Sequence, residues 1–155
     1  MLEIVKHPNP ALKCRCSPVA IVGDDEKELL RNMARAMYLN HGVGLAAPQI
    51  GINRQIAVVD IGDKNVLNLI NPEIIEADGT EVMEEGCLSI PEIYIHVKRA
   101  QRIKVKSMDE NGRETVLEAN GLMARVILHE IDHLKGRLII DHINPIRRFL
   151  VLKKK

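Results

Sequence analysis

Residues 129 to 133 read His-Glu-Ile-Asp-His, and this run is where the chain could do chemistry. Two histidines four positions apart on a helix lie one turn apart on the same face, so both imidazoles can reach one metal ion. Glu130 can reach a water on that metal without occupying a coordination position. The metal would lower the pKa of the water and the carboxylate would move its proton, which is the chemistry of a hydrolase. Short patterns of this kind also arise by chance on helices with surface histidines.

The surrounding residues favour a helix that faces inward. From Asn120 to Gly136 the chain reads NGLMARVILHEIDHLKG, with Asn120 as the expected N-cap and Gly136 as the glycine that ends the helix. An apolar stripe at helical spacing continues into the motif, through Leu122, Val126, His129, Glu130 and His133. Two buried imidazoles beside a carboxylate need a compensating partner, and a divalent cation supplies one.

The third metal ligand would decide the class of enzyme. Thermolysin-type peptidases take it from a downstream glutamate, and no glutamate follows Glu130. The metzincin pattern requires a histidine at position 139, which holds isoleucine. Asp141 and His142 remain as downstream candidates. Cys87 is the better candidate, because a thiolate is a soft donor and a glycine beside it permits close approach. A lone cysteine is also often just a small buried hydrophobic residue.

Three separated segments resemble the signature motifs of the peptide deformylase family: Gly42-Val43-Gly44-Leu45-Ala46-Ala47-Pro48-Gln49, Glu85-Gly86-Cys87-Leu88-Ser89 and His129-Glu130-Ile131-Asp132-His133. They occur in the family's order, and the resemblance extends over essentially the whole chain. Each motif alone is suggestive, whereas the three together in a chain of this length are specific. The resemblance implies a bacterial-type enzyme that removes the formyl group from N-formylmethionyl nascent peptides and releases formate.

The resemblance also implies a ligand set. Cys87, His129 and His133 would hold the metal and leave the fourth position to water, as in catalytic sites. A mixed set of sulfur and nitrogen donors accepts Fe(II), Zn(II), Ni(II) or Co(II), so the ligands alone do not choose among them. The resemblance implies Fe(II) as the working metal.

Three residues are expected to carry the catalysis. Glu130 would take a proton from the metal-bound water and later deliver it to the leaving amine. By the family pattern, the side-chain amide of Gln49 and the backbone N–H of Leu88 would stabilise the negative charge that develops on the formyl oxygen. An amide that merely caps its own loop is the alternative for Gln49.

The expected substrate-binding residues belong to the same segments: Val43, Gly44, Glu85, Gly86, Leu122 and Val126. Exposed backbone beside the glycines would let an extended peptide pair like an added strand, which suits nascent chains of any sequence. The resemblance implies a methionine pocket lined by Val43, Leu122, Val126 and the ring of His129. Arg125 lies where an apolar residue would fit that pocket better, so we expect it to swing outward or to contact the substrate backbone. Tyr94 stands where some family members carry a basic residue, which puts the outer subsites in doubt.

Composition indicates a small cytoplasmic enzyme. The chain has 155 residues, of which 46% are hydrophobic, so we expect one catalytic domain over residues 1–155. Three cysteines, an odd number, argue against a disulfide framework, and Cys14 and Cys16 are expected to be ordinary thiols. The chain shows no signal peptide and no membrane-spanning run. A net charge of +1 and 2% aromatic residues predict no specific nucleic-acid site.

The pattern of elements predicts an α+β fold. A helix is expected from about 25 to 40, with Leu29, Leu30, Met33 and Met37 inward and Gly42 closing it. Strands are expected at 55–61, 66–75, 102–106 and 115–118, the last two joined by a turn at Asn111-Gly112. Strands that precede a late helix favour antiparallel sheets wrapped around that central helix, and the resemblance implies the same arrangement. Asp132 is expected either to pair with Arg99 or to be a surface carboxylate.

The C-terminal residues predict a short basic helix. Asn144-Pro145 has the pattern of an N-cap followed by proline, and Ile146, Phe149 and Leu150 follow at helical spacing. The basic residues here are Arg147, Arg148 and Lys153 to Lys155. They suggest either a solvated tail or an electrostatic contact with the ribosome. Two alternatives to the deformylase stay open at this point: a metallopeptidase that uses His142 as its third ligand, and a structural metal-binding module.

Overall fold

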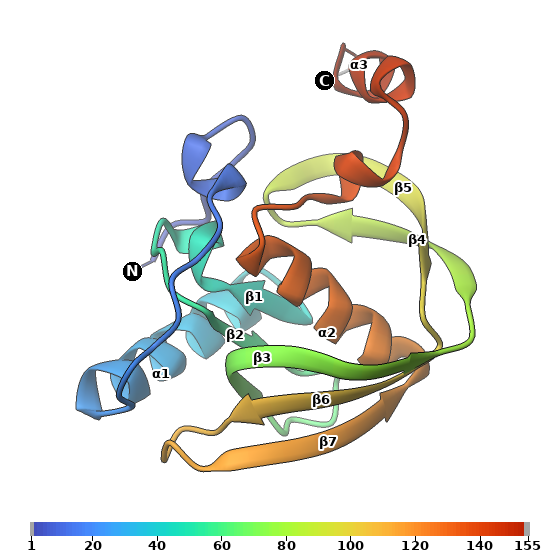
Figure 1. The fold of residues 1–155 in the computed structure, drawn as a ribbon. Coiled ribbons are helices and arrows are strands. Elements are labelled where there is room, and N and C mark those ends of the chain that lie inside the picture. Colours follow the sequence, from blue (N-terminus) through green and yellow to red (C-terminus); the bar gives the residue numbers. More distant parts are fainter. Residues whose placement is uncertain (1, 154–155) are drawn as a thin grey trace.

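The computed structural model describes residues 2–153, which form two antiparallel sheets with a helix between them (Figure 1). The larger sheet has the order β1-β2-β3-β6-β7, and its strands are Gly44–Ala46, Ile56–Val59, Leu67–Asp78, Arg102–Met108 and Glu114–Asn120. The smaller sheet pairs β4 (Glu81–Cys87) with β5 (Ile90–Arg99). The helices are α1 (Asp24–Leu39), α2 (Gly121–Leu134) and α3 (Pro145–Lys153), with 3-10 turns η1 (Pro10–Lys13), η2 (Ala47–Ile50) and η3 (Ile139–His142). The predicted α+β fold is confirmed.

Helix α2 is the central helix of the fold (Figure 1). Its apolar side chains, among them Ile127, Ile131 and Leu134, pack against one face of the larger sheet. The helix carries the His-Glu-x-x-His run, so burial of this apolar face also orients the two histidines. The expected wrapping of antiparallel sheets around this helix is therefore what the chain adopts.

The two ends of α2 differ in how well they were predicted. Asn120 is the N-cap residue, as predicted, but its side chain makes no capping hydrogen bond. Asn120 is also the last residue of β7, paired with Arg102, and the chain turns straight into the helix at Gly121 with φ +56. Gly136 does end the helix, with φ +75, and a Cβ there would lie 2.5 Å from the carbonyl oxygen of Lys13. Only glycine fits that position.

Helix α1 covers the opposite face of the larger sheet. Leu30, Met33 and Met37 are buried, in a cluster with the alternate residues of β1 and β2. The predicted helix is confirmed, but the left-handed residue at its end is His41, with φ 57, and not Gly42. Gly42 contributes through its N–H, which donates to the carbonyl oxygen of Met37 at 2.9 Å.

The strands predicted at 55–61, 66–75, 102–106 and 115–118 are present as β2, β3, β6 and β7. The turn between β6 and β7 is longer than a two-residue hairpin. Met108 pairs with Glu114, and the carboxylate of Asp109 accepts from the N–H groups of Asn111 and Arg113.

The β4–β5 hairpin was not predicted. Ile93, Ile95 and Val97 of β5 are buried in a third apolar cluster, together with Ile139 and Ile140 of η3. Cys87 is the last residue of β4 and pairs with Ile90 across a tight turn. The hairpin therefore sets the position of the cysteine relative to α2.

Helix α3 begins as predicted and projects from the body of the fold (Figure 1). The side chain of Asn144 accepts from the N–H of Arg147 at 2.9 Å, which confirms the cap. The apolar residues Ile146, Phe149 and Leu150 are exposed. Lys154 and Lys155 lie outside the described residues. Within residues 2–153, no helix combines the length and the apolar character needed to cross a bilayer.

Candidate active site

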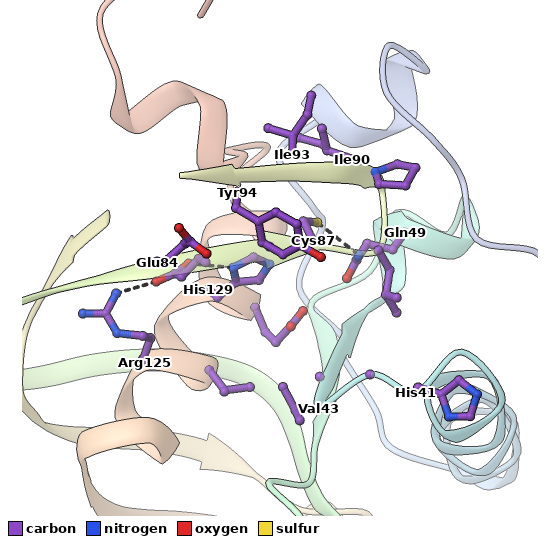
Figure 2. A pocket seen from close by; sticks show the side chains of 18 of the residues that line it. His41, Val43, Gln49, Glu84, Cys87, Ile90, Ile93, Tyr94, Arg125 and His129 are labelled. Atoms are coloured by element: carbon purple, nitrogen blue, oxygen red, sulfur yellow. Dashed lines mark hydrogen bonds and ion pairs between the residues drawn. The ribbon is translucent and has the colours of Figure 1, made fainter. Parts of the chain in front are cut away.

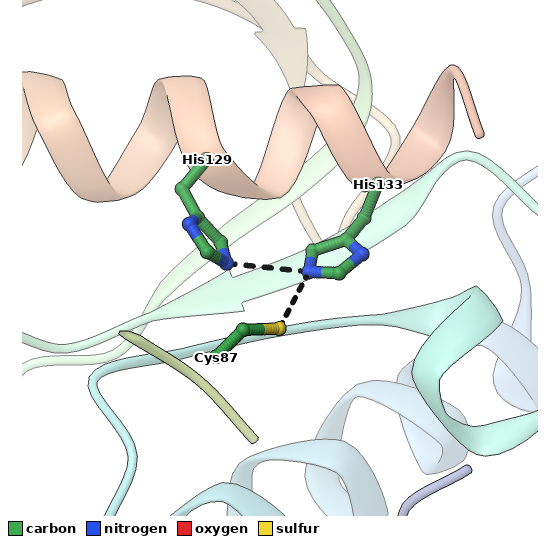
Figure 3. A group of neighbouring side chains, drawn as sticks. All are labelled: Cys87, His129 and His133. Atoms are coloured by element: carbon green, nitrogen blue, oxygen red, sulfur yellow. Dashed lines mark hydrogen bonds between the residues drawn. The ribbon is translucent and has the colours of Figure 1, made fainter. Parts of the chain in front are cut away.

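Cys87, His129 and His133 meet in one group, formed by the end of β4 and by two successive turns of α2 (Figure 3). The Nε2 atoms of the two histidines are 3.2 Å apart, and the Sγ of Cys87 is 3.4 Å from the Nε2 of His133. With metal–nitrogen bonds of about 2.05 Å and metal–sulfur bonds of about 2.3 Å, tetrahedral coordination requires separations of roughly 3.3 and 3.6 Å. These two separations, with all three donor atoms within 4.8 Å of one another, fit a tetrahedral transition metal.

The protonation of the two histidines reflects their contacts. Burial alone would lower the pKa of His129, but hydrogen bonds to Cys87 and Glu85 outweigh it and raise the pKa to about 10. Burial and the nearby charge of His129 hold the pKa of His133 well below its usual value. His129 thus favours its protonated form and His133 its neutral form, because the two rings are too close to be charged together. A bound cation can take the place of the proton on His129.

Glu85 fixes the orientation of His129. The Oε1 atom of Glu85 lies 2.9 Å from the Nδ1 of His129. The guanidinium of Arg99 donates to both carboxylate oxygens of Glu85, from Nε to Oε2 at 2.6 Å and from Nη2 to Oε1 at 2.8 Å. Burial would raise the pKa of Glu85, but Arg99 and His129 keep it well below its usual range. A carboxylate on the far nitrogen of a metal-binding histidine sets the ring's tautomer and direction. The Glu85 side chain, expected among the substrate-binding residues, is engaged in this way.

Arg125 also binds Glu85, so the expectation that it swings outward is wrong. It is buried, and its Nη1 donates to Glu85 at 2.6 Å and to the carbonyl oxygen of Val97 at 2.9 Å. Its Nη2 donates to the carbonyl oxygen of Glu81 at 2.7 Å. A buried guanidinium needs acceptors, and the β4–β5 hairpin supplies them. Arg125 therefore fastens α2 to the hairpin instead of swinging outward.

Asp132 forms a 2.9 Å ion pair with Arg99, which was one of the two alternatives predicted for it. The same Oδ2 atom of Asp132 lies 2.8 Å from the Nε2 of His142. His142 is thus held at Asp132 and is not part of the group of three donors. Asp141, the other downstream candidate, pairs with Lys13 at 3.2 Å. Both downstream candidates for the third ligand are therefore engaged elsewhere.

Glu130 is buried beside this group, and its Oε2 has no hydrogen-bond partner among the described residues. Burial raises its pKa to about 7, against the opposing charges of His129 and Arg99. Gly44 makes room for it, because a Cβ on Gly44 would lie 2.4 Å from the Oε1 of Glu130. The carboxylate is thus packed tightly against the backbone of β1.

Gln49 faces the same space from η2. Its Oε1 accepts from the N–H of Ala46 at 3.0 Å, so the loop-capping alternative describes one end of this amide. The other end, Nε2, lies 3.7 Å from the Sγ of Cys87 and 3.2 Å from the Oγ of Ser89. The amide is buried and held at its oxygen, which leaves its N–H groups directed toward the metal-binding group.

A pocket of about 510 Å³ opens beside these groups (Figure 2). Its lining includes the residues expected to bind substrate and to donate to the oxyanion: Val43, Gly44, Gln49, Glu85, Gly86, Leu88, Leu122 and Val126. Val126 is buried, whereas Leu122 is 49% exposed, which corrects its assignment to the inward stripe. The ring of Tyr94 lies against Gly86, where a Cβ would meet it at 2.9 Å. Tyr94 therefore forms an outer wall of the pocket.

The polypeptide deformylase family model matches residues 1–149. The chain belongs to the polypeptide deformylase family. It is 44% identical to the peptide deformylase of Thermodesulfovibrio yellowstonii, over 99% of this chain and 96% of that one. It is 49% identical to peptide deformylase 1 of Bacillus anthracis, over 92% of each chain. The crystal structure of the Thermotoga maritima peptide deformylase superposes with a TM-score of 0.90 at 46% identity, covering 94% of this chain and 99% of that one.

A further structure in this family is that of a complex. The peptide deformylase of Synechococcus elongatus, solved in complex with actinonin, matches with a TM-score of 0.93 at 41% identity, over 99% of this chain and 85% of that one. The present deformylase is a hydrolase of protein biosynthesis that removes the formyl group from an N-terminal methionine.

Several pocket residues of the deformylase were not singled out from the sequence. Met83, Ile93 and His41 line the pocket, and so does Lys6, whose Nζ donates to the carbonyl oxygen of Leu88 at 2.9 Å. The alternation of Ile93 and its neighbours along β5 was the available signal for one of them. Lys6 had no local signal, because it reaches the turn after β4 from the other end of the chain.

Proposed function

We propose that residues 1–155 act as one catalytic domain whose metal is held by Cys87, His129 and His133. The observation that carries this proposal is that the separations from His133 to His129 and to Cys87 match those of a tetrahedral site, with all three donor atoms within 4.8 Å of one another. Fe(II) is the proposed working metal, and Zn(II), Ni(II) or Co(II) suit the same donors. When bound, such an ion lowers the pKa of a water and polarises the formyl carbonyl.

Glu130 moves the proton in this proposal. Its carboxylate takes a proton from the attacking water and delivers it to the nitrogen of the methionine as the formyl group leaves as formate. A general base works best when its pKa is close to the working pH, and burial raises that of Glu130 to about 7. Its burial against Gly44 keeps bulk water away from the carboxylate.

Gln49 and Leu88 stabilise the negative charge on the formyl oxygen. The hydrogen bond from Ala46 to the amide oxygen of Gln49 turns its Nε2 toward Cys87 and Ser89, and in this proposal the formyl oxygen takes the place of one of these two acceptors. The carbonyl of Leu88 is held by Lys6, which steadies the turn that presents the Leu88 N–H. Donors held in place before the reaction cost no reorganisation when the charge appears.

The methionine side chain is proposed to bind against Val43, Leu122 and Val126, which line the pocket on one side of the metal-binding group. The peptide that follows would run along the backbone of Gly44 and Gly86 as an added strand. Glu85 contributes through the orientation of His129, because its carboxylate is already engaged. Recognition of backbone and methionine alone suits an enzyme whose substrates differ beyond the first residue.

Two variants test these assignments on the same preparations. Glu130→Gln nearly preserves volume and removes the proton carrier, so it should keep about one metal per chain while turnover falls by roughly 10²–10⁴-fold. His129→Ala removes a ligand and should lose both metal and activity. Metal content and formate release from a formyl-Met peptide are measured for each. Loss of metal from Glu130→Gln, or wild-type turnover in it, would overturn the assignment.

We also propose that the enzyme works in the cytoplasm and contacts the ribosome through α3 and the basic tail. Arg147 is exposed on α3, whereas Arg148 pairs with Asp141 at 3.6 Å and is only partly available. Deleting Lys153 to Lys155 should weaken co-sedimentation with ribosomes, most strongly at low salt. The variant Lys64→Gln, a surface charge on the loop before β3, serves as the control. Unchanged co-sedimentation of the deletion at every salt concentration would refute the contact.

A further inference from the structure

His142 is the one histidine of the described chain that was a candidate ligand and is not used as one. It lies at the end of η3, with its side chain only 15% exposed. Its Nε2 is 2.8 Å from the Oδ2 of Asp132. Asp132 sits next to a proposed ligand, His133, but its carboxylate meets Arg99 and His142 and is not one of the three donors. A largely buried ring that binds this carboxylate needs an explanation.

Asp132 is the first link of a chain of buried charges. The Oδ2 atom that meets His142 also accepts from the Nη1 of Arg99 at 2.9 Å. Arg99 in turn donates hydrogen bonds to both carboxylate oxygens of Glu85, through Nε at 2.6 Å and Nη2 at 2.8 Å. The side chains of Arg99 and Glu85 are 5% and 6% exposed. Water cannot replace any of these partners at low cost.

The chain ends on a proposed metal ligand, since Glu85 meets the Nδ1 of His129 at 2.9 Å. Four elements contribute to it: η3, α2, β5 and β4. The two hydrogen bonds from Arg99 hold the carboxylate of Glu85 in one orientation, and that orientation fixes the ring of His129. The guanidinium of Arg99 is held in turn by Asp132, whose rotation His142 limits.

We propose that His142 is a positioning residue for His129. It acts through Asp132 and Arg99, the two side chains that stand between it and Glu85. The inference rests on the proposed metal site, because it assigns His142 an effect on a ligand of that site. Loss of the His142 hydrogen bond lets the Asp132 carboxylate turn toward solvent, loosens Arg99 and widens the range of directions that the His129 ring adopts.

The test compares two amides at position 142 in the Co(II)-loaded full-length chain. In His142→Gln the amide nitrogen reaches nearly as far as the imidazole Nε2, whereas in His142→Asn it stops one methylene short. His142→Asn should shift the visible absorption bands of Co(II) and speed Co(II) release to a chelator by about 3- to 10-fold, less than the loss of a direct outer partner. Its kcat should fall while KM for a formyl-Met peptide stays within about twofold. His142→Gln should restore wild-type values.

Lys13→Met is the matched control. It breaks the ion pair of Lys13 with Asp141, the neighbour of His142 in η3, without touching Asp132. This variant should lower thermal stability at most and leave the Co(II) spectrum and release rate unchanged. If His142→Asn fails to fold, His142→Phe keeps the ring and its packing, and the same changes are expected.

Three results would overturn the role of His142. These are a folded His142→Asn or His142→Phe variant with wild-type Co(II) spectrum and release, equal behaviour of the Gln and Asn variants, and the same changes in Lys13→Met. Failure of the metal site itself is seen separately. If the wild type binds one Co(II) and Cys87→Ala loses it, the site stands whatever His142 does.

Discussion

Gly44→Ala should slow the enzyme about 100-fold without removing its metal. A Cβ at this position would lie 2.4 Å from the Oε1 of Glu130, 2.9 Å from its Cδ and 3.0 Å from its Cγ. Gly44 is not among the glycines with positive φ, so alanine can adopt its backbone conformation. The substitution therefore tests the contact with Glu130 and not backbone strain.

The magnitude follows from the distance that the carboxylate must move. An ordinary carbon–oxygen contact is about 3.4 Å or longer, so Oε1 has to retreat by roughly 1 Å. A displacement of about 1 Å in a catalytic group costs on the order of 10²-fold in rate. That factor corresponds to about 2.7 kcal/mol on the activation barrier. The donors Cys87, His129 and His133 are untouched, so metal content should stay near one per chain.

The assay is formate release from a formyl-Met peptide, with metal content measured on the same sample. Gly23→Ala is the control, since its added Cβ meets Glu26 at an ordinary 3.6 Å and lies at the start of α1. The double variant Gly44→Ala/Glu130→Gln should be no slower than Glu130→Gln alone, because both changes remove the same function. Wild-type kcat in Gly44→Ala, or a further 100-fold loss in the double variant, would refute the reasoning.

Three further outcomes are expected. Iron-loaded enzyme should lose activity in air through oxidation of the metal or Cys87 while nickel-loaded enzyme survives, and equal lifetimes would count against Fe(II). Arg125→Met removes one buried partner of Glu85 and should lower the free energy of unfolding, measured in urea titrations, by about 3–5 kcal/mol. A loss under about 1 kcal/mol would contradict the conclusion that Arg125 holds α2 against the β4–β5 hairpin. Burial raises the pKa of Asp141, but a backbone N–H and Lys13 lower it on balance. The stability that the ionised Asp141 contributes is therefore fully present at pH 7 and is lost as the pH falls through its lowered pKa, so the stability gap between wild type and Asp141→Asn should narrow progressively as the pH falls below about 4.

The features that sequence analysis predicted are those set by local spacing. Two histidines four apart on an apolar stripe face inward wherever the helix packs, which is why His129 and His133 could be paired in advance. The Val- and Ile-rich strands of the larger sheet and the glycine after α2 were predicted for the same reason. The β4–β5 hairpin was missed because its turn, Leu88-Ser89, has no glycine, proline or asparagine and Pro91 interrupts the second strand.

The surroundings of the metal-binding group depend on contacts between distant residues. Arg125 meets carbonyl groups 28 and 44 positions away, and only the register of β4 against β5 decides which ones face it. From the sequence, a charge at that position looked out of place in an apolar pocket. In the fold it is neutralised by Glu85, and the pocket beside it keeps its apolar lining of Val43, Leu122 and Val126.

Glu85 shows how the contacts of a motif residue stay hidden when only its neighbours in sequence are known. It precedes Gly86 and Cys87, so it was grouped with the residues expected to meet the peptide. In the fold its carboxylate contacts two arginines and the Nδ1 atom of His129. Burying a carboxylate with two guanidinium partners costs free energy, because all of these charged groups must be desolvated, and substrate contact alone would not require it. The arrangement suits the orientation of a metal-binding ring, because a carboxylate held in one position fixes the direction of the ring nitrogen that it contacts.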